Sequence, residues 1–434
     1  MTAINKSGQR TEDPMTLKYM KLIRSMLITV GLWPGEAVAG KPHRIPFANM
    51  FITWQSCFCI YGELLFIYRR FRILSFFVLG DVCIAFSLTM LNLVRAVFPY
   101  SDTYGAIFHD FVSVFHLKHF KHKSEYARKT CETVDRISYY FSLYMTVIMV
   151  IGVSSFNLTP QYHNYQNGIF KDDAPENITI EFAVYYSFPY FEQEDHIAVS
   201  NLYNVFLSYI CAVEVCILDL FLCVAVFQTI GHIHTLVNTL RSFPGHRKLQ
   251  HPVQFRKSVG ADSGSISVEI IRDFDDEENK IIKKLIKECV EHHFFIVSFT
   301  ERLSKFFGPL LGFNYMYQTF CLCILLLQCM GGGGALMRYA PLTLITFGQL
   351  LQFSVTFEIV GAESEKLKDE VYYLPWESMS VSNQKAILLF LRRVQTPIHV
   401  MAMGMTPVGV KTMGNIIKTT FSYYAFLRTS QGLK

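Results

Sequence analysis

Long apolar stretches alternate with polar, charged segments along the 434 residues of the chain. At a rise of about 1.5 Å per residue, a helix needs about 20 such residues to cross a hydrocarbon core of about 30 Å. We expect seven membrane-spanning helices, near Ile45–Tyr68, Ile73–Phe98, Ser138–Phe156, Leu202–Ile230, Phe306–Met330, Leu336–Val360 and Val408–Thr429. The pattern therefore predicts an all-α membrane protein with seven transmembrane helices.

Two further segments are amphipathic, and we do not predict that they span the membrane. Met15–Val30 places apolar residues at helical spacing and carries Lys18, Lys21 and Arg24 on the other side, which is typical of a helix at the membrane surface. Ser382–Val394 is too short to span and ends in two arginines. We expect it to be a cytoplasmic packing helix.

The last predicted span carries a line of small polar residues. This polar stripe, with spacings of three, four, three and seven, lies on one helical face and consists of Thr412, Asn415, Thr419, Ser422 and Thr429. Phe426 interrupts it where another small polar residue would fall. The stripe fits either the wall of a pore, with Phe426 as a dewetting gate, or a surface packed against neighbouring helices through its hydroxyls.

Composition supports a membrane protein and gives no sign of an enzyme. Apolar residues make up 51% and aromatic residues 15% of the chain. Nine of the eleven cysteines fall inside predicted spans, so we expect neither a disulfide framework nor a zinc site. His116, His119 and His122 alternate with lysines and predict a basic cytoplasmic surface near anionic lipid. No nucleophile–base pattern or cofactor motif is present in the sequence, and we expect no cofactor and no metal.

The distribution of Lys and Arg predicts the orientation. The first 45 residues hold seven of these residues, whereas the loop after the third span holds only Lys171 against seven acids. That loop also contains the sequon Asn177-Ile178-Thr179, which predicts glycosylation at Asn177. We therefore expect a cytoplasmic N-terminus and an extracellular C-terminus. Arg69, Arg70 and Arg72 disagree, because this topology places them outside.

The predicted orientation is opposite to that of G-protein-coupled receptors. The chain also lacks an acid-Arg-aromatic triplet at the third span, and its last span has no Asn-Pro-x-x-Tyr. A transporter is disfavoured because the two halves show no repeat.

The C-terminal third resembles the insect odorant receptor family. The resemblance rests on four runs: Tyr373-Leu374-Pro375-Trp376, Arg392-Arg393-Val394-Gln395-Thr396-Pro397, Ala402-Met403-Gly404 and the closing Phe421–Thr429. The ending Ser-Tyr-Tyr-Ala-Phe-Leu-Arg-Thr is similar to moth receptors and, among them, to the sex-pheromone branch. Gly31-Leu32-Trp33-Pro34 is similar to the family as well.

The resemblance implies a subunit of a ligand-gated, non-selective cation channel built from four subunits around a central pore. In such channels a tuning receptor pairs with a shared co-receptor, and the last helix lines the pore. Ser422-Tyr423, followed by Phe426 and Thr429, resembles a tuning subunit. We therefore expect the pore and gate to involve Phe426, Thr429, Ser422, Thr419 and Asn415. The expected location is the plasma membrane, in dendrites of olfactory neurons.

The resemblance also implies an odorant pocket in the outer half of the bundle. The residues we expect to line it are Phe77, Phe86, Ile151, Ser155, Phe156, Tyr209, Val213, Tyr317 and Phe320. An apolar cavity with one or two hydroxyls suits a long aliphatic alcohol, aldehyde or ester. Taken singly, each of these residues also fits ordinary core packing.

Four regions follow from these expectations. They are a cytoplasmic N-terminus with an amphipathic helix (1–44), a six-helix ligand-binding bundle (45–360), a cytoplasmic anchor region (361–407) and a pore-lining helix with the C-terminus (408–434). The bundle includes a cytoplasmic insert (231–293), whose residues 243–280 we expect to be partly disordered. Glu214 and Asp219 lie inside the fourth span, and we expect them either to pair with Arg95 or Arg302 or to line a solvated cleft.

Two other classes of receptor stay open at this point. A metabotropic seven-helix receptor would signal through a cytoplasmic transducer, and its currents would vanish when G-protein signalling is blocked. A gustatory relative would share the C-terminal architecture.

Overall fold

The computed structural model describes residues 13–41, 45–169, 180–245, 247–254, 265–331 and 335–430. Six helices in these ranges are long and apolar enough to cross a membrane. They are α3 (Phe47–Arg70), α4 (Phe76–Ala96), α6 (Glu125–Gln166), α7 (Ile197–Arg241), α8 (Asp276–Cys329) and α9 (Ala335–Tyr372). The predicted seventh span is α11 (Val410–Ser430), which is not among these six. The prediction of a helical membrane fold is confirmed.

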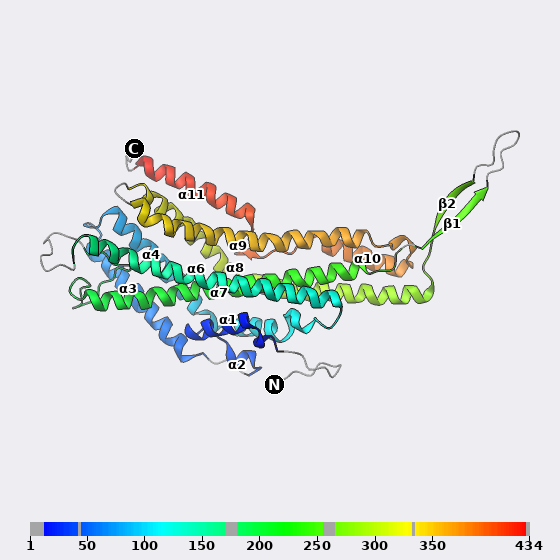
Figure 1. Ribbon diagram of the computed structural model, residues 1–434, viewed down its shortest axis with the longest axis horizontal. Coiled ribbons are helices and arrows are strands. Elements are labelled where there is room, and N and C mark those ends of the chain that lie inside the picture. Colours follow the sequence, from blue (N-terminus) through cyan, green and yellow to red (C-terminus); the bar gives the residue numbers. More distant parts are fainter. Residues whose placement is uncertain are drawn as a thin grey trace.

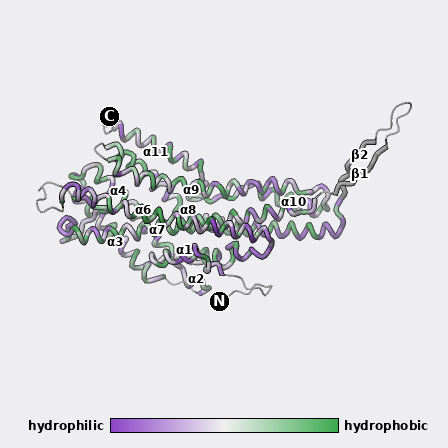
Figure 2. The backbone as a smooth tube through the Cα atoms, in the orientation of Figure 1, coloured by the Kyte–Doolittle hydropathy of each residue, from purple (hydrophilic) through white to green (hydrophobic). Residues whose placement is uncertain are grey.

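The long helices α7, α8 and α9 run lengthwise through the molecule (Figure 1). Helix α7 is apolar on all sides and lies between α6, α8 and α9, so most of its middle is buried. Phe221 of α7 stacks on Phe108, and Phe111 meets its edge. The most hydrophobic part of the tube follows these central helices (Figure 2).

Helices α7, α8 and α9 extend well beyond the predicted spans. A capping box formed by Asp275 and Glu278 starts α8, and the pairs Lys284–Glu288 and Lys287–Glu291 support its exposed first part. Between α7 and α8, β1 (Arg247–Gln254) pairs antiparallel with β2 (Ser265–Arg272). The described part of the insert therefore contains two strands and the start of α8.

Helix α1 (Lys18–Thr29) packs against α6 and α7. Tyr19 of α1 bonds to His116, whose Nε2 lies 2.7 Å from the tyrosine hydroxyl oxygen. His116 and Lys118 are both buried, so the prediction of an exposed basic surface is wrong at these two positions. The short helices α2 (Gly35–Val38) and α5 (Asp102–Asp110) pack against each other on the same side of the molecule (Figure 1).

The chain reverses twice after α9. Helix α10 (Val381–Val394) packs back on α8 and α9, as expected for a packing helix. A small hairpin of β3 (Met401–Ala402) and β4 (Thr406–Pro407) then leads into α11, with Gly404 at a φ of +69° in its turn. The hairpin is fixed to α8 because Met403 donates its backbone N–H to the carbonyl of Gly308 at 2.9 Å. A side chain at Gly308 would collide with the carbonyl oxygen of Met401.

Candidate functional site

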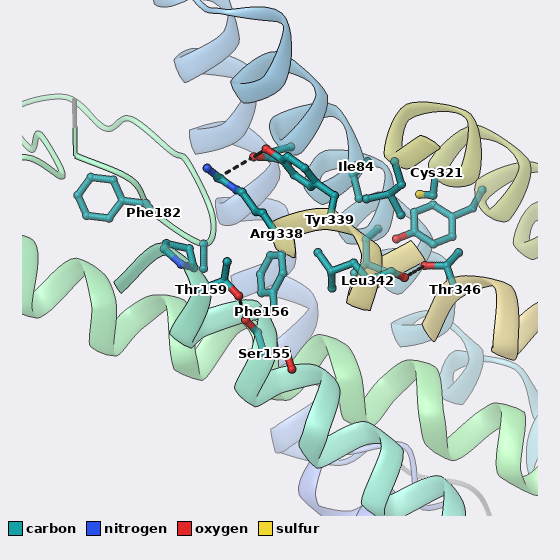
Figure 3. Close-up of a pocket in the computed structure, with 16 residues that line it drawn as sticks. Ile84, Ser155, Phe156, Thr159, Phe182, Cys321, Arg338, Tyr339, Leu342 and Thr346 are labelled. Atoms are coloured by element: carbon teal, nitrogen blue, oxygen red, sulfur yellow. Dashed lines mark hydrogen bonds and ion pairs between the residues drawn. The ribbon is translucent and has the colours of Figure 1, made fainter. Parts of the chain in front are cut away.

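Three adjoining cavities lie among the membrane helices. The outer cavity, of about 150 Å³, is shown in Figure 3 and is bounded by α4, α6, α8, α9 and residues 182–183. The central cavity, of about 380 Å³, lies among α4, α6, α7, α8 and α9. The α3 cavity, of about 180 Å³, lies between α3, α4, α6 and α7 and also touches α9. Leu88 of α4 lines all three.

The walls of the three cavities are mostly apolar. Phe156 and Leu342 separate the outer cavity from the α3 cavity, and Tyr317 and Thr346 separate it from the central cavity. Thr346 donates its hydroxyl to the backbone of Leu342 at 2.9 Å, and Thr159 bonds in the same way to Ser155 at 2.7 Å. The two threonine hydroxyls are thereby satisfied within their own helices. Such walls suit a lipophilic ligand with few polar atoms.

The structure brings three of the predicted pocket residues together. Ser155 and Phe156 line the outer cavity from α6, and Tyr317 lines it from α8. Phe156 also reaches the α3 cavity, and Tyr317 also reaches the central cavity. All three are drawn in the close-up, where the phenyl ring of Phe156 stands between Arg338 and Ser155 (Figure 3).

The other six predicted residues line none of the three cavities. Ile151, Tyr209 and Phe320 lie on the outside of the bundle, where they are 49%, 42% and 41% exposed. Val213 is buried in the main core, and Phe77 stacks on Tyr339. Phe86 is only partly buried. Asn177 lies outside the described residues.

A cluster of charged groups lies in the wall of the outer cavity. Arg338 lies 2.8 Å from a carboxylate oxygen of Glu181 and donates to Asp81 at 3.3 Å. Asp81 also accepts from the hydroxyl of Tyr339 at 3.3 Å and from Gln328 at 3.0 Å. Sequence reasoning missed this cluster, although an acid in an apolar span and an arginine at the start of another were both visible.

Residues 180–196, which we name the cover segment, lie over the outer and α3 cavities. Phe182, Ala183 and Val184 are buried and contribute to the cavity walls. Asn164 holds one end of the segment through two bonds to the backbone of Glu181, at 2.8 and 2.9 Å. Burial raises the pKa of Tyr185 to about 12, so its hydroxyl stays protonated.

Two arginines that disagreed with the predicted orientation bind the cover segment. Arg70 pairs with Glu194 at 2.6 Å and with Glu192 at 3.4 Å. Arg69 pairs with Glu192 at 3.4 Å and donates to the hydroxyl of Ser187 at 2.9 Å. The basic turn after α3 and the acidic loop after α6 therefore neutralise each other at one end of the bundle.

A buried ion pair joins two membrane helices, as predicted for Asp219, whereas the carboxylate oxygens of Glu214 have no hydrogen-bond partner among the described residues. Arg95 of α4 lies 3.9 Å from Asp219 of α7. It also donates to Asn92 at 3.0 Å and to Asn314 of α8 at 2.7 Å. Arg302, the alternative partner, pairs instead with Asp110 at 2.5 Å.

Within the part of the chain that the structure describes, helix α11 is buried along one side. Thr420 is buried against α8, and Met413, Ile416 and Ile417 are half-buried against the main core. The opposite side carries the polar stripe, in which Asn415, Thr419, Ser422 and Thr429 are exposed and Thr412 is half-buried. Phe426 is 69% exposed on the same side. The helix stands apart from the bundle beside α9 (Figure 1).

The helices that line the cavities also hold α11. In α8, Tyr317 and Cys321 line the outer cavity, and the thiol of Cys323 donates to the backbone carbonyl of Thr420 at 3.6 Å. In α9, the carboxylate of Glu358 accepts the backbone N–H of Val410, the first residue of α11, at 3.0 Å. A ligand that moved α8 or α9 would therefore act on α11 directly.

The family model for the 7tm Odorant receptor matches residues 79–421. The chain belongs to the insect odorant receptor family. The match covers four of the six apolar helices completely, together with α10 and the first half of α11. The chain is accordingly a multi-pass membrane protein of a receptor family.

Curated relatives agree with this assignment. Odorant receptor 85c of Drosophila melanogaster is 24% identical over 162 residues, which are 37% of this chain and 41% of that protein. Odorant receptor 10 of Aedes albopictus is 22% identical over 156 residues, which are 35% of this chain and 41% of that protein. The alignments thus span about two fifths of the length of these relatives.

A solved structure shares the whole fold. The insect olfactory receptor OR5 from Machilis hrabei superposes with a TM-score of 0.70 at 12% identity, over 94% of this chain and 97% of that one. The structure of the same receptor in complex with eugenol gives a TM-score of 0.69 at 13% identity, over 95% and 98% of the two chains.

Proposed function

We propose that this protein is the odorant-tuning subunit of a ligand-gated, non-selective cation channel. The ligand occupies the three adjoining cavities, and the pore is lined by α11 of four subunits, at least one of which is a shared co-receptor. The N-terminus is cytoplasmic, the C-terminus is extracellular, and the channel resides in the plasma membrane of olfactory neurons.

The exposed polar stripe of α11 carries this proposal. A membrane helix cannot present Asn415, Thr419 and Ser422 to lipid without cost, because their polar groups lose water there. The hydroxyl hydrogens of Thr419 and Ser422 are satisfied within the helix. Thr419 donates to the backbone carbonyl of Asn415 and Ser422 to that of Lys418, both at 2.9 Å. The amide of Asn415 and the hydroxyl lone pairs still require a wet surface. Four copies of this side around an axis provide one.

Phe426 is the proposed gate. It lies on the polar side of α11 near the C-terminal end of the helix, with 69% of its surface open. Rings from several subunits at one level would form an apolar constriction that excludes water when narrow. Thr429, one turn further, would line the pore beyond it.

The ligand is proposed to be a long, lipophilic odorant such as a pheromone. The central cavity alone, at about 380 Å³, falls within the range of about 300–1,000 Å³ typical of small-molecule sites. The fold neighbour from Machilis hrabei was solved with eugenol. A small aromatic odorant and an aliphatic chain both match the apolar walls described above.

Gating would follow from the contacts of α8 and α9. A ligand that binds one bundle geometry more tightly shifts the population toward it. Because α8 and α9 line the cavities and also bind α11 through Cys323 and Glu358, a change in their packing reaches Phe426 without further intermediates.

The inner ends of α9 and α10 are proposed to join neighbouring subunits. Large apolar side chains are exposed there, including Tyr373, Trp376, Leu388 and Leu389. Exposed apolar surface of this kind at the inner end of the bundle is typical of a contact between proteins.

Co-expression decides between this proposal and a metabotropic receptor. Whole-cell currents would be recorded from cells expressing the chain alone, a co-receptor alone or both, with G-protein signalling blocked. Long-chain alcohols, aldehydes and acetates would be applied. We expect fast cation current that requires both subunits and persists under the block. Current that disappears under the block would overturn the channel proposal.

A further inference from the structure

Glu63 is a buried acid in the middle of an apolar helix, and it lines the α3 cavity. Its residue is 0% exposed. One carboxyl oxygen, Oε1, accepts a hydrogen bond from the hydroxyl of Thr89 at 3.2 Å. The other oxygen, Oε2, is buried and has no hydrogen-bond partner among the residues that the structure describes. A buried polar atom left in this state costs free energy, so a partner supplied from the cavity would be stabilising.

The surroundings of Glu63 favour a neutral partner over a cation. Among the described residues, no Lys or Arg lies within ion-pair distance of Glu63, in contrast to Asp219, which faces Arg95. An uncharged carboxyl group is far less costly than a carboxylate in such a cavity inside the bilayer. In the uncharged form, the carboxyl group of Glu63 carries a hydrogen and is a hydrogen-bond donor in the cavity wall.

The α3 cavity adjoins the central cavity. Leu88, Gly152, Val153, Ala212 and Ile345 line both. Gly152 has no side chain at the boundary of the two cavities, and a Cβ built there would lie 3.9 Å from Ile345. An aliphatic chain in the central cavity could therefore extend past Gly152 and place its polar end at Glu63.

The cover segment shields this end from water. Ser187 donates its backbone N–H to the carbonyl of Gly62 at 3.0 Å, next to Glu63. The ring of Phe188 lies where a side chain at Gly62 would be, at 2.7 Å from that position. A hydrogen bond formed at Glu63 would thus be shielded from water. Hydrogen bonds in such sites discriminate strongly between ligands with and without the matching group.

We propose that Glu63 binds the neutral, oxygen-bearing head group of the ligand. Its carboxyl O–H donates to an aldehyde or ester carbonyl oxygen, while the aliphatic tail fills the central cavity. This inference rests on the proposed ligand-binding function and names the head group that the same site selects. An amine would not be preferred, because Glu63 is uncharged.

The test compares matched ligands on matched variants. Concentration–response curves would be recorded for straight-chain aldehydes and for the corresponding hydrocarbons of equal length, with the co-receptor present. The variants are Glu63→Met, which removes the donor, and Glu63→Gln, which keeps an N–H donor. Glu214→Gln is the control, since Glu214 is another buried acid of the bundle with unpartnered oxygens but lines none of the three cavities.

Glu63→Met is expected to lower the potency of aldehydes by about 10-fold or more, the scale of one hydrogen bond in an apolar site. The potency of aldehydes on Glu63→Gln should stay within about threefold of the wild-type value, because the amide keeps a hydrogen-bond donor. This change corresponds to about 0.7 kcal/mol of binding free energy. Potencies of hydrocarbons should not change. An equal loss for both ligand classes, or no loss, would overturn the proposal. The proposal would also be overturned if an amine were more potent than the aldehyde on the wild type and lost this potency on Glu63→Gln.

A binding measurement separates this inference from the channel proposal. Purified protein in detergent would be heated with and without the aldehyde, and the shift in unfolding temperature recorded. One possible result is that the wild type shows no current with any ligand, while the aldehyde raises the unfolding temperature of the wild type but not that of Glu63→Met. In that case the head-group site is supported and the channel proposal fails. Equal stabilisation of both proteins overturns the head-group site.

Discussion

The thiol of Cys323 in α8 lies 3.6 Å from the backbone carbonyl oxygen of Thr420 in α11. Both residues are buried, and Cys321, two positions earlier in α8, lines the outer cavity. One helix therefore presents one face to the proposed ligand and another to the proposed pore helix.

Cys323→Leu is expected to raise the current in the absence of ligand. The larger side chain overpacks the contact between α8 and α11, at a cost of about 1–3 kcal/mol. Such a cost changes the closed–open equilibrium by about 5-fold to 150-fold if it falls mainly on the closed state. The measurement is basal current normalised to surface expression. Cys57→Leu is the matched control because Cys57 is exposed on α3, and equal basal current in both variants would contradict the coupling.

Arg338→Gln is expected to lower ligand potency by about 10-fold. Without the guanidinium, Asp81 and Glu181 lose their shared partner, and the cover segment is held less firmly over the outer cavity. The expected cost is about 1–3 kcal/mol, as for hydrogen bonds to charged groups that are partly buried. Concentration–response curves and ligand washout times would be measured together, with faster washout expected.

Arg70→Gln is the control for this effect. Arg70 binds the same segment through Glu192 and Glu194, but these side chains are more than one third exposed. Exposed pairs contribute about 0–1 kcal/mol, so potency should change less than about fivefold. A larger loss for Arg70→Gln than for Arg338→Gln would show that the outer cluster has no special role.

Arg95→Met is expected to reduce the folded fraction sharply. Removal of the cation leaves Asp219 buried and uncompensated, which costs about 3–5 kcal/mol in comparable pairs. The double variant Arg95→Met with Asp219→Leu removes both charges and should regain most of the loss. Surface expression and unfolding temperature in detergent measure the effect. A double variant as unstable as the single one would contradict the pairing.

Acidification is expected to destabilise the packing of α1 through His116. Burial, followed by the nearby His119 and Lys118, lowers the pKa of His116 well below 6.5. Nδ1 accepts the backbone N–H of Lys118 at 3.1 Å, so the neutral ring carries its hydrogen on Nε2 and donates it to Tyr19. Because the unfolded state takes up the proton first, stability present above pH 6.5 is lost below it, by about 1.4 kcal/mol per pH unit.

Unfolding temperatures at pH 7.5 and 5.5 would measure this loss. His116→Gln, which cannot take up a proton in this range, should show a smaller drop than the wild type. An equal drop in both proteins would place the pH dependence elsewhere.

The sequence predicted the helices better than their ends. Apolar runs located the six long helices, but α7, α8 and α9 continue through polar residues outside the spans, where helix packing and ion pairs such as Lys287–Glu291 maintain them. Hydropathy describes transfer into lipid and does not measure these contacts. The polar side of α11 was predictable because its period is that of a helix.

The cavity walls were predictable only in part. Ser155, Phe156 and Tyr317 were anticipated, whereas Ile151 and Phe320 face outward. A span that is apolar on all sides carries no signal for the side that faces a cavity. Glu63 could have been found, because the reasoning that selected Glu214 and Asp219 as costly acids inside a span applies to it equally.

The pore assignment of α11 is tested most directly by cysteine accessibility. Ser422→Cys and Tyr423→Cys would each be expressed with the co-receptor, and ligand-evoked current recorded before and after a charged, membrane-impermeant methanethiosulfonate reagent. Ser422 lies in the polar stripe, and Tyr423 is also exposed in the single chain but lies outside the stripe. We expect the reagent to block most of the current in Ser422→Cys and little in Tyr423→Cys or the wild type. Block of Tyr423→Cys with Ser422→Cys unaffected would contradict a pore lined by the stripe.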